Sequence, residues 1–135
     1  MLRLVSLAAL LLVAACSPAE RPEVACQKRI VAIRTQPDEP AETGAVSADP
    51  FHAQGYAALD LTGCTPEQRS KVARLTDLAK RLPVLMEANE RAAATGNDSA
   101  HMAAFQTMND GLIALDDLEQ GAAADLERML AEPAA

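Results

Sequence analysis

The chain has 135 residues, of which 12 are basic and 19 acidic, and its formal net charge of −7 disfavours nucleic acid because phosphates repel an acidic surface. Half of the residues are apolar but only 2% are aromatic, so any core has to be built from small and medium side chains. Such a core suits closely packed helices better than a sheet, which favours β-branched and aromatic residues. We therefore predict a single, modest all-α domain.

The first 15 residues have the composition of an export signal. Arg3 supplies a positive charge, residues 4–13 form a largely apolar run, and two alanines follow. The run is too short to span a bilayer as a helix, which needs about 20 apolar residues. The order Val13-Ala14-Ala15-Cys16 resembles the lipobox of bacterial lipoproteins. This resemblance implies cleavage before Cys16 and attachment of lipid to its thiol.

The same resemblance implies a location. Ser17 beside the lipidated cysteine is similar to the pattern of Gram-negative lipoproteins that are exported to the outer membrane. We therefore expect a signal peptide over residues 1–15, a lipidated tether over residues 16–21, and a mature protein on the periplasmic face of the outer membrane. Without residues 1–15 the net charge is −8, which disfavours a polybasic membrane patch, so the lipid is the expected membrane contact.

Two cysteines remain for the mature domain. Cys26 and Cys64 would lie in an oxidising compartment, where two cysteines usually pair. A redox-active pair usually has the close Cys-x-x-Cys spacing, which these residues lack. We predict a structural disulfide that closes a loop of about 38 residues and stabilises the fold by roughly 4 kcal/mol.

Residues 22–63 are predicted to hold one short element and a long irregular connection. A helix is favoured over residues 22–35 by a proline and a glutamate at its start and by apolar residues on one face; a strand over residues 30–33 is the alternative. Residues 36–50 are rich in proline and acids, which is typical of a solvated loop. Apolar residues then return, and Cys64 would hold the end of this segment, so we expect it to pack back onto the body. These residues are Phe51, Tyr56, Leu59 and Leu61.

A second helix is predicted to begin at Pro66. Thr65 can accept a hydrogen bond from the amide of Gln68, Gln68 can reach back to Thr65, and Pro66 occupies a position where a missing N–H costs nothing. Pro83 lies within the apolar pattern that follows, so it either kinks or breaks this helix; the pattern keeps its phase, which favours a kink. The apolar stripe consists of Val72, Leu75, Ala79, Leu82 and Met86, with Leu78 and Leu85 beside it.

Residues 95–98, with the sequence Thr-Gly-Asn-Asp, predict a turn, because glycine can end one helix and asparagine or aspartate can cap the next. A last helix is expected over residues 98–130, with a bend near Gly121. Glu119 interrupts its stripe at a position where an apolar residue is expected. The stripe consists of Phe105, Met108, Leu112, Leu115, Ala122, Leu126 and Met129.

Residues 64–132 thus predict an antiparallel helical hairpin. Residues 66–93 carry six basic and four acidic side chains, whereas residues 98–132 carry one basic and eight acidic, which favours this pairing. Two helices cannot enclose both stripes. Either the Cys26 segment completes a three-helix bundle through the disulfide, or the hairpin buries its remaining face against another chain, a second copy included. The candidate partner-binding residues are Leu78, Leu85, Phe105, Met108 and Leu112.

The sequence contains no motif that indicates catalysis. It has no Gly-x-Ser-x-Gly elbow, no His-Glu-x-x-His pair and no phosphate-binding glycine loop. Asp116, Asp117 and Glu119 are near neighbours on a helix and would point in different directions, which is typical of a solvated face rather than of an acid–base pair. We predict that the protein is not an enzyme and has no catalytic residues.

Soft metal ligands occur at one place. His101 and Met102 are adjacent, with Met108 nearby, but adjacent residues on a helix project about 100° apart. Methionine at helical spacing is also typical of a core. We predict no metal site and no cofactor.

The run Thr65-Pro66-Glu67-Gln68-Arg69, followed by Lys71, Val72 and Leu75, resembles the start of a helix in periplasmic heavy-metal-resistance and stress-chaperone hairpins. In that family a leucine-threonine-proline-glutamate-glutamine motif recurs; here Cys64 takes the place of the leucine, and the last helix holds no second copy. The resemblance covers about a dozen residues. It implies a periplasmic chaperone or metal-resistance sensor as an alternative function.

The leading hypothesis is a non-enzymatic, lipid-anchored module that binds a partner protein of the cell envelope. An accessory subunit or pilot of an outer-membrane complex would have these features: an anchor, a tether, and a hairpin with more apolar face than it can bury alone.

Overall fold

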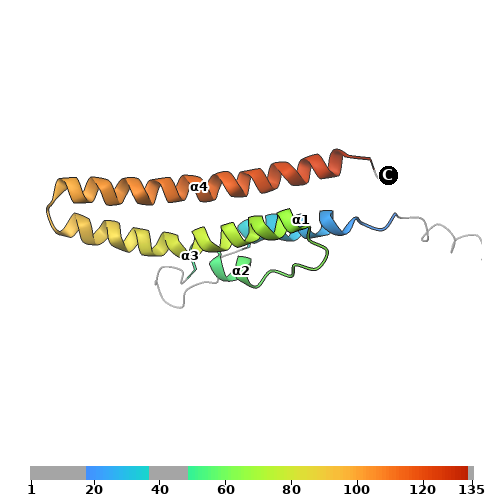
Figure 1. Cartoon of the computed structure of the whole chain (residues 1–135), viewed down its shortest axis with the longest axis horizontal. Helices are drawn as coiled ribbons and strands as arrows, with labels where there is room; N and C mark the ends of the chain where they lie inside the picture. The colour runs from blue at the N-terminus through green and yellow to red at the C-terminus, as the bar shows by residue number, and fades with distance from the viewer. Residues whose placement is uncertain (1–17, 37–48, 134–135) are drawn as a thin grey trace, which may run out of the picture.

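The computed structural model describes residues 18–36 and 49–133. Within these ranges all regular structure is helical, which confirms the predicted all-α class (Figure 1). The expected signal peptide, Cys16 and most of the proline-rich connection lie outside the described residues. The four helices are α1 (Pro22–Arg34), α2 (Ala53–Ala57), α3 (Pro66–Ala94) and α4 (Asp98–Ala131).

The sequence allowed either a helix over residues 22–35 or a strand over residues 30–33, and the structure shows helix α1 here. Pro22 occupies its first turn, Glu23 lies near the positive end of the helix dipole and Arg34 near the negative end. One face is buried in the core, which explains why a short helix is stable here. That face is made by Val24, Cys26, Ile30 and Ile33, each at most 4% exposed.

The second half of the connection packs back onto the body, as predicted. It also contains a short helix that the sequence did not indicate. The carboxylate of Asp49 accepts hydrogen bonds from the amides of Ala53 (2.7 Å) and Gln54 (2.9 Å), which starts the five-residue helix α2. This short helix buries Tyr56, which is 2% exposed. Five residues are too few for an apolar period to become visible in the sequence. Phe51, Leu59 and Leu61 also pack against the core.

Helix α3 begins at Pro66 with the predicted capping box. The amide of Gln68 donates to the Thr65 hydroxyl (3.1 Å), and the amide of Thr65 donates to the Gln68 side chain (2.9 Å). The helix runs without a break through Pro83 to Ala94, so of the two alternatives for Pro83 the break is wrong. Met86 is a second correction: it was predicted in the buried stripe but is 38% exposed.

The predicted turn joins α3 to α4. Gly96 adopts a positive φ of 70°, which glycine reaches without strain, and the Asn97 side chain caps α4 by accepting from the amide of Ala100 (3.1 Å). Helix α4 then continues to Ala131 through Gly111 and Gly121. Of its predicted stripe only Leu115 and Ala122 are buried, while Phe105 is 46% exposed.

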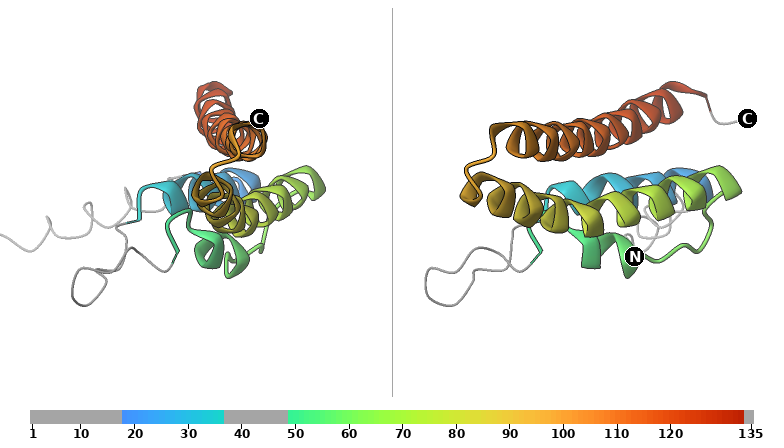
Figure 2. Two further views of the ribbon diagram at one scale, coloured as in Figure 1. Left: turned by 90° about the vertical axis from the view of Figure 1, so that its left-hand side faces the viewer. Right: turned by 60° about the vertical axis from the view of Figure 1, so that its left-hand side comes forward.

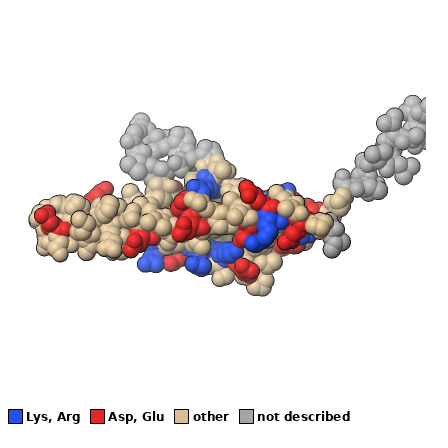
Figure 3. Space-filling model, turned by 90° about the horizontal axis from the view of Figure 1, so that it is seen from above, with Lys and Arg blue, Asp and Glu red and all other residues tan. Residues whose placement is uncertain are grey.

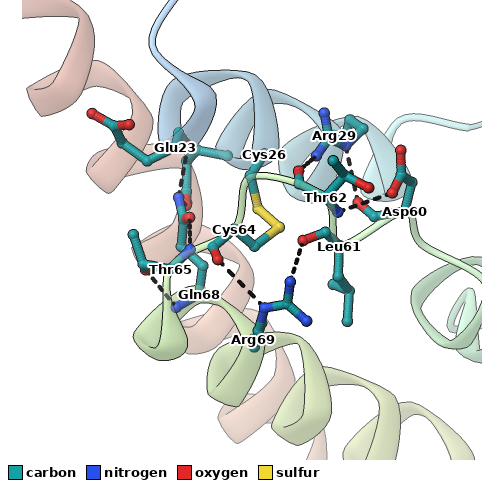
Figure 4. Close-up of a disulfide and its surroundings, with 11 residues drawn as sticks. Glu23, Cys26, Arg29, Asp60, Leu61, Thr62, Cys64, Thr65, Gln68 and Arg69 are labelled. Atoms are coloured by element: carbon teal, nitrogen blue, oxygen red, sulfur yellow. Dashed lines mark hydrogen bonds between the residues drawn. A yellow bond between two sulfur atoms is a disulfide. The ribbon is translucent and has the colours of Figure 1, made fainter.

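The predicted disulfide is present and joins α1 to the residue that precedes the cap of α3. The Cα atoms of Cys26 and Cys64 are 5.2 Å apart (Figure 4). The approach of the two segments is close, because a Cβ atom on Gly63, whose φ is 75°, would lie 2.9 Å from the Cβ atom of Pro22. Arg29 and Arg69 complete this corner by donating to the carbonyl oxygens of residues 60–62 and 64.

Helices α1 and α2 cover only one part of the hairpin. Helix α1 packs against the part of α4 farther from the turn, and α2 packs against the middle of α3 (Figure 1). Of the described residues, only those of α3, α4 and the turn between them form the end that carries the turn, as the two further views also show (Figure 2). The three-helix alternative therefore holds at the disulfide end, whereas the hairpin remains uncovered toward the turn.

Two glycines of α4 should respond oppositely to alanine. A Cβ atom on Gly121 would meet nothing within 4 Å, so Gly121→Ala should raise the free energy of unfolding by about 1 kcal/mol through helix propensity. On Gly111 the Cβ atom would lie 3.1 Å from Cδ2 of Leu82 and 3.3 Å from Cδ1 of Leu85. This overpacking costs about 1–3 kcal/mol and outweighs the propensity gain, so Gly111→Ala should lower the stability. Urea unfolding followed by circular dichroism measures both; equal effects would contradict the packing.

Candidate protein-binding surface

Two buried glutamines connect the three helices at the disulfide end. Gln27 of α1 is 1% exposed; its amide donates to the carbonyl of Ala122 in α4 (2.8 Å) and its oxygen accepts from Gln68 of α3 (3.0 Å). Gln68 also donates to the carbonyl of Glu23 (2.8 Å). Buried amides that are fully paired fix the relative position of the elements that they join, because any shift would leave a polar group unsatisfied. This network holds the hairpin rigidly at one end.

Glu119, which interrupts the apolar stripe of α4, belongs to a second polar cluster. Its carboxylate accepts a hydrogen bond from the hydroxyl of Tyr56 (2.8 Å) and forms an ion pair with Arg34 (3.4 Å), which also pairs with Asp116 (3.0 Å). Burial, together with the hydrogen bond to Glu119 and its negative charge, raises the pKa of Tyr56 well above the usual value. Glu119 therefore connects α4 to both α1 and α2, and its position in the stripe is a structural requirement.

The Tyr56 hydroxyl gives a prediction for alkaline pH. In the unfolded chain this group loses its proton near pH 10, whereas the raised pKa keeps it protonated in the folded protein. The free energy of unfolding should therefore fall as the pH rises above 10, by about 1 kcal/mol between pH 10 and pH 11 from this residue. Tyr56→Phe should lack this contribution. Denaturant unfolding of both proteins at pH 7, 10 and 11 measures the difference; parallel pH profiles would contradict it.

Charge pairing along the hairpin is uneven. Lys71 of α3 and Asp125 of α4 lie 2.6 Å apart and are mostly shielded from solvent; this contact raises the pKa of Lys71 and lowers that of Asp125. Among the described residues it is the single ion pair between the two long helices. Asp116 and Glu119 of α4 instead pair with Arg34 of α1. The predicted attraction between α3 and α4 is thus limited to the disulfide end.

Apolar side chains are concentrated on the other end of the hairpin, which we call the distal hairpin (residues 81–113). Within the described ranges the structure has six exposed large hydrophobic residues, and five of them lie in this segment. On the face that Figure 3 shows, the left-hand end of the molecule is mostly uncharged with isolated acidic side chains. A concentration of this kind on a small protein is typical of a surface that contacts another protein. The five residues are Val84, Met86, Met102, Phe105 and Ile113.

The five residues proposed from sequence all lie on the hairpin but differ in exposure. Phe105 is exposed and Met108 is half-buried, whereas the three leucines are partly buried against the core. Leu78 and Leu85 also line a groove of about 310 Å³ between α3 and α4. Val84, Met102 and Ile113 were missed because they lie off the stripe that the period selects. Their signal in the sequence is an apolar residue outside the predicted stripe.

The side chains considered above for catalysis and metal binding lie among the described residues. No three His, Cys, Asp or Glu side chains of this part of the chain come together in a way that could hold a metal ion. His101 is half-buried and Met102 is 66% exposed. Asp116 and Glu119 both pair with Arg34, but the Asp116 side chain stays 48% exposed, as expected for a solvated face, whereas the Glu119 side chain is 12% exposed and departs from that prediction.

Comparisons with known proteins return no match, whether the chain is compared with protein-family models, with curated proteins or with solved structures. In the part of the chain that the structure describes, every helix is too short or too polar to cross a membrane.

Proposed function

We propose that this chain is a non-enzymatic, lipid-anchored module of the bacterial periplasm that binds one partner protein through the distal hairpin. An accessory subunit or pilot of an outer-membrane complex is the class of protein with this design. The expected lipid on Cys16 supplies the anchor, and residues 16–21 connect it to α1.

The observation that carries the proposal is the uncovered apolar surface of the distal hairpin. Burying a large apolar side chain contributes about 1.5–3 kcal/mol, so residues such as Met102 and Phe105, left 66% and 46% exposed, can supply binding energy to a partner. The length of the hairpin also supports the proposal. Helix α3 has 29 residues, so its turn end lies about 43 Å from the disulfide corner near the tether. A surface at that distance is well placed to meet a protein rather than the lipid that anchors the chain.

Chemical cross-linking in intact cells of the native host tests the proposal. The wild-type chain should return one dominant envelope protein by mass spectrometry, and a Phe105→Ser, Met102→Ser double variant should lose it. The matched control is Leu130→Ser, which removes an equally exposed apolar side chain (58%) outside the distal hairpin and should retain the partner. A scatter of unrelated client proteins would contradict the proposal and favour the chaperone alternative.

The anchor is tested separately. Cells fed with radiolabelled palmitate should label the wild-type chain but not Cys16→Ser, and only the wild-type chain should sediment with membranes. An unlabelled, water-soluble wild-type chain that retains Met1 would remove the lipid anchor from the proposal.

A further inference from the structure

The face of α4 that α1 covers continues beyond the end of α1. Residues seven apart lie on nearly the same face of an α-helix. Glu119 pairs with Arg34, which is the last residue of α1. Leu112 lies seven residues before Glu119 on this row and is half-buried. Phe105 lies fourteen residues before Glu119 and is 46% exposed. Beyond the end of α1 this row is therefore apolar and progressively uncovered.

Helix α3 shows the same change on its own core face. Val72 and Ala79 are 4% and 1% exposed, because α1 and α2 lie over this part of the core. Met86, seven residues further along the same row, is 38% exposed. The third layer of the bundle thus ends near Arg34 while both long helices continue. The resulting surface, here called the uncovered face, consists of Met86 and Glu90 of α3 and of Asp98, Met102, Phe105 and Leu112 of α4.

We propose that the uncovered face binds an amphipathic helix of the partner protein, which lies in line with α1 and extends the three-helix packing to the turn. This inference rests on the proposed function and specifies its partner. The stretch from Asp98 to Leu112 spans 15 residues of α4, so the partner helix has about four turns at 1.5 Å per residue. Recognition is of the helix-in-groove kind, with apolar side chains at i, i+3, i+4 and i+7.

Charge specifies the partner further. The distal hairpin contains two arginines and four acids, and both arginines already pair within α3, Arg81 with Asp77 and Arg91 with Glu87. Among the described residues Glu90 and Asp98 have no ion-pair partner, and both belong to the uncovered face. Helix α1 already uses an arginine against Asp116 and Glu119 of α4. The partner helix accordingly carries Lys or Arg along the edges of its apolar face.

The same charges disfavour other occupants. In a dimer, two distal hairpins would face each other, and each has a net charge of −2 because it contains two arginines and four acids. The two hairpins would therefore repel each other. Residues 37–48, which follow α1 in the sequence, contain three acids and a single large aliphatic residue, Val46, so they cannot supply the apolar side chains that this face would bury. A membrane surface with anionic lipids would be repelled.

Site-specific photo-cross-linking of the full chain in its native host tests the inference. A benzophenone amino acid replaces Met86 or Met102 on the uncovered face, or Val84 as the control. Val84 is 59% exposed, and it points about 160° away from Met86 on the helix. We expect one partner, cross-linked at least tenfold more strongly from positions 86 and 102 than from position 84. The partner peptide identified by mass spectrometry should lie in a segment with helical apolar periodicity and basic flanks.

A charge variant adds a second readout. Asp98→Asn should lower the yield from position 102 by about threefold, as an exposed ion pair would. Asp110→Asn is the matched control, because Asp110 lines the groove on the other side of the hairpin, and it should leave the yield unchanged. Circular dichroism of each variant verifies that the helices are intact. Equal yields for both variants would overturn the proposed basic edge.

The outcomes separate the inference from the proposed function. A single partner that cross-links best from position 84 overturns the inference but leaves the proposed function standing. Cross-links to a second copy, to residues 37–48, or to a partner segment without basic flanks also overturn the inference. Many unrelated proteins at every position, or no cross-link at any position, overturn both.

Discussion

Breaking the Cys26–Cys64 disulfide is expected to lower the free energy of unfolding by about 4 kcal/mol. The bond closes a loop across 38 residues of sequence separation, so its loss greatly increases the conformational freedom of the unfolded chain. It also ties α1 to the start of α3, where the two buried glutamines depend on a fixed position. For a small domain, 4 kcal/mol is a large fraction of the total stability.

Urea unfolding of the oxidised protein, of the protein with reducing agent, and of a Cys26→Ser, Cys64→Ser variant measures this effect. The control is Cys16→Ser, which leaves the bonded pair intact and should unfold at the wild-type urea concentration. If reduction left the midpoint of unfolding unchanged, the disulfide would contribute nothing to stability, and the corner in Figure 4 would be held by its hydrogen bonds alone.

Leu82→Ala should cost about 3 kcal/mol, within the range of 2–5 kcal/mol for a fully buried leucine. Leu82 is 0% exposed and packs in the core near Gly111, so its truncation removes buried contacts and leaves a cavity. Met86→Ala, one turn further along the same helix, removes a comparable volume at a position that is 38% exposed and should cost less than about 1 kcal/mol.

Thermal or urea unfolding of the two variants measures where the core ends along α3. Similar losses for Leu82→Ala and Met86→Ala would mean that the distal hairpin is covered in solution, for instance by a second copy, and unfolding at several protein concentrations would reveal such an oligomer. A clear difference between the two variants would locate the end of the core between them, within one turn of α3.

These predictions reflect an uneven distribution of stabilising contacts. The disulfide, the paired glutamines, and the cluster of Tyr56, Glu119 and Arg34 all lie at the end that α1 and α2 cover. The distal hairpin has one helical interface and a row of exposed apolar residues. A partner that binds the folded hairpin would therefore also stabilise it, in proportion to RT ln(1 + [L]/Kd). Rigidity at one end and exposed apolar surface at the other are compatible with a presented binding element.

The sequence by itself determined the features that depend on neighbours in the chain. Three such features are the capping box of Thr65 and Gln68, which is made by side-chain hydrogen bonds, the positive φ of Gly96 in the turn, and the proline in the first turn of α1. Apolar periodicity likewise predicted the two long helices and their facing stripes. The disulfide was predictable because the lipid expected on Cys16 leaves two cysteines, in a compartment that is expected to be oxidising.

The tertiary structure alone decided what covers each stripe and for how far. Helical periodicity identifies the apolar face of a helix, but it contains no information on the length of the neighbour that will cover that face. The sequence therefore predicted Met86 in the core, although it is 38% exposed. Glu119 interrupted the apolar stripe of α4 for no visible reason, but it accepts a hydrogen bond from Tyr56, 63 residues away in the sequence. Helix α1 has 13 residues, whereas α3 and α4 have 29 and 34, so the described residues leave a long part of the hairpin uncovered. Contacts between residues far apart in the chain decide burial, and burial decides which apolar side chains remain available to a partner.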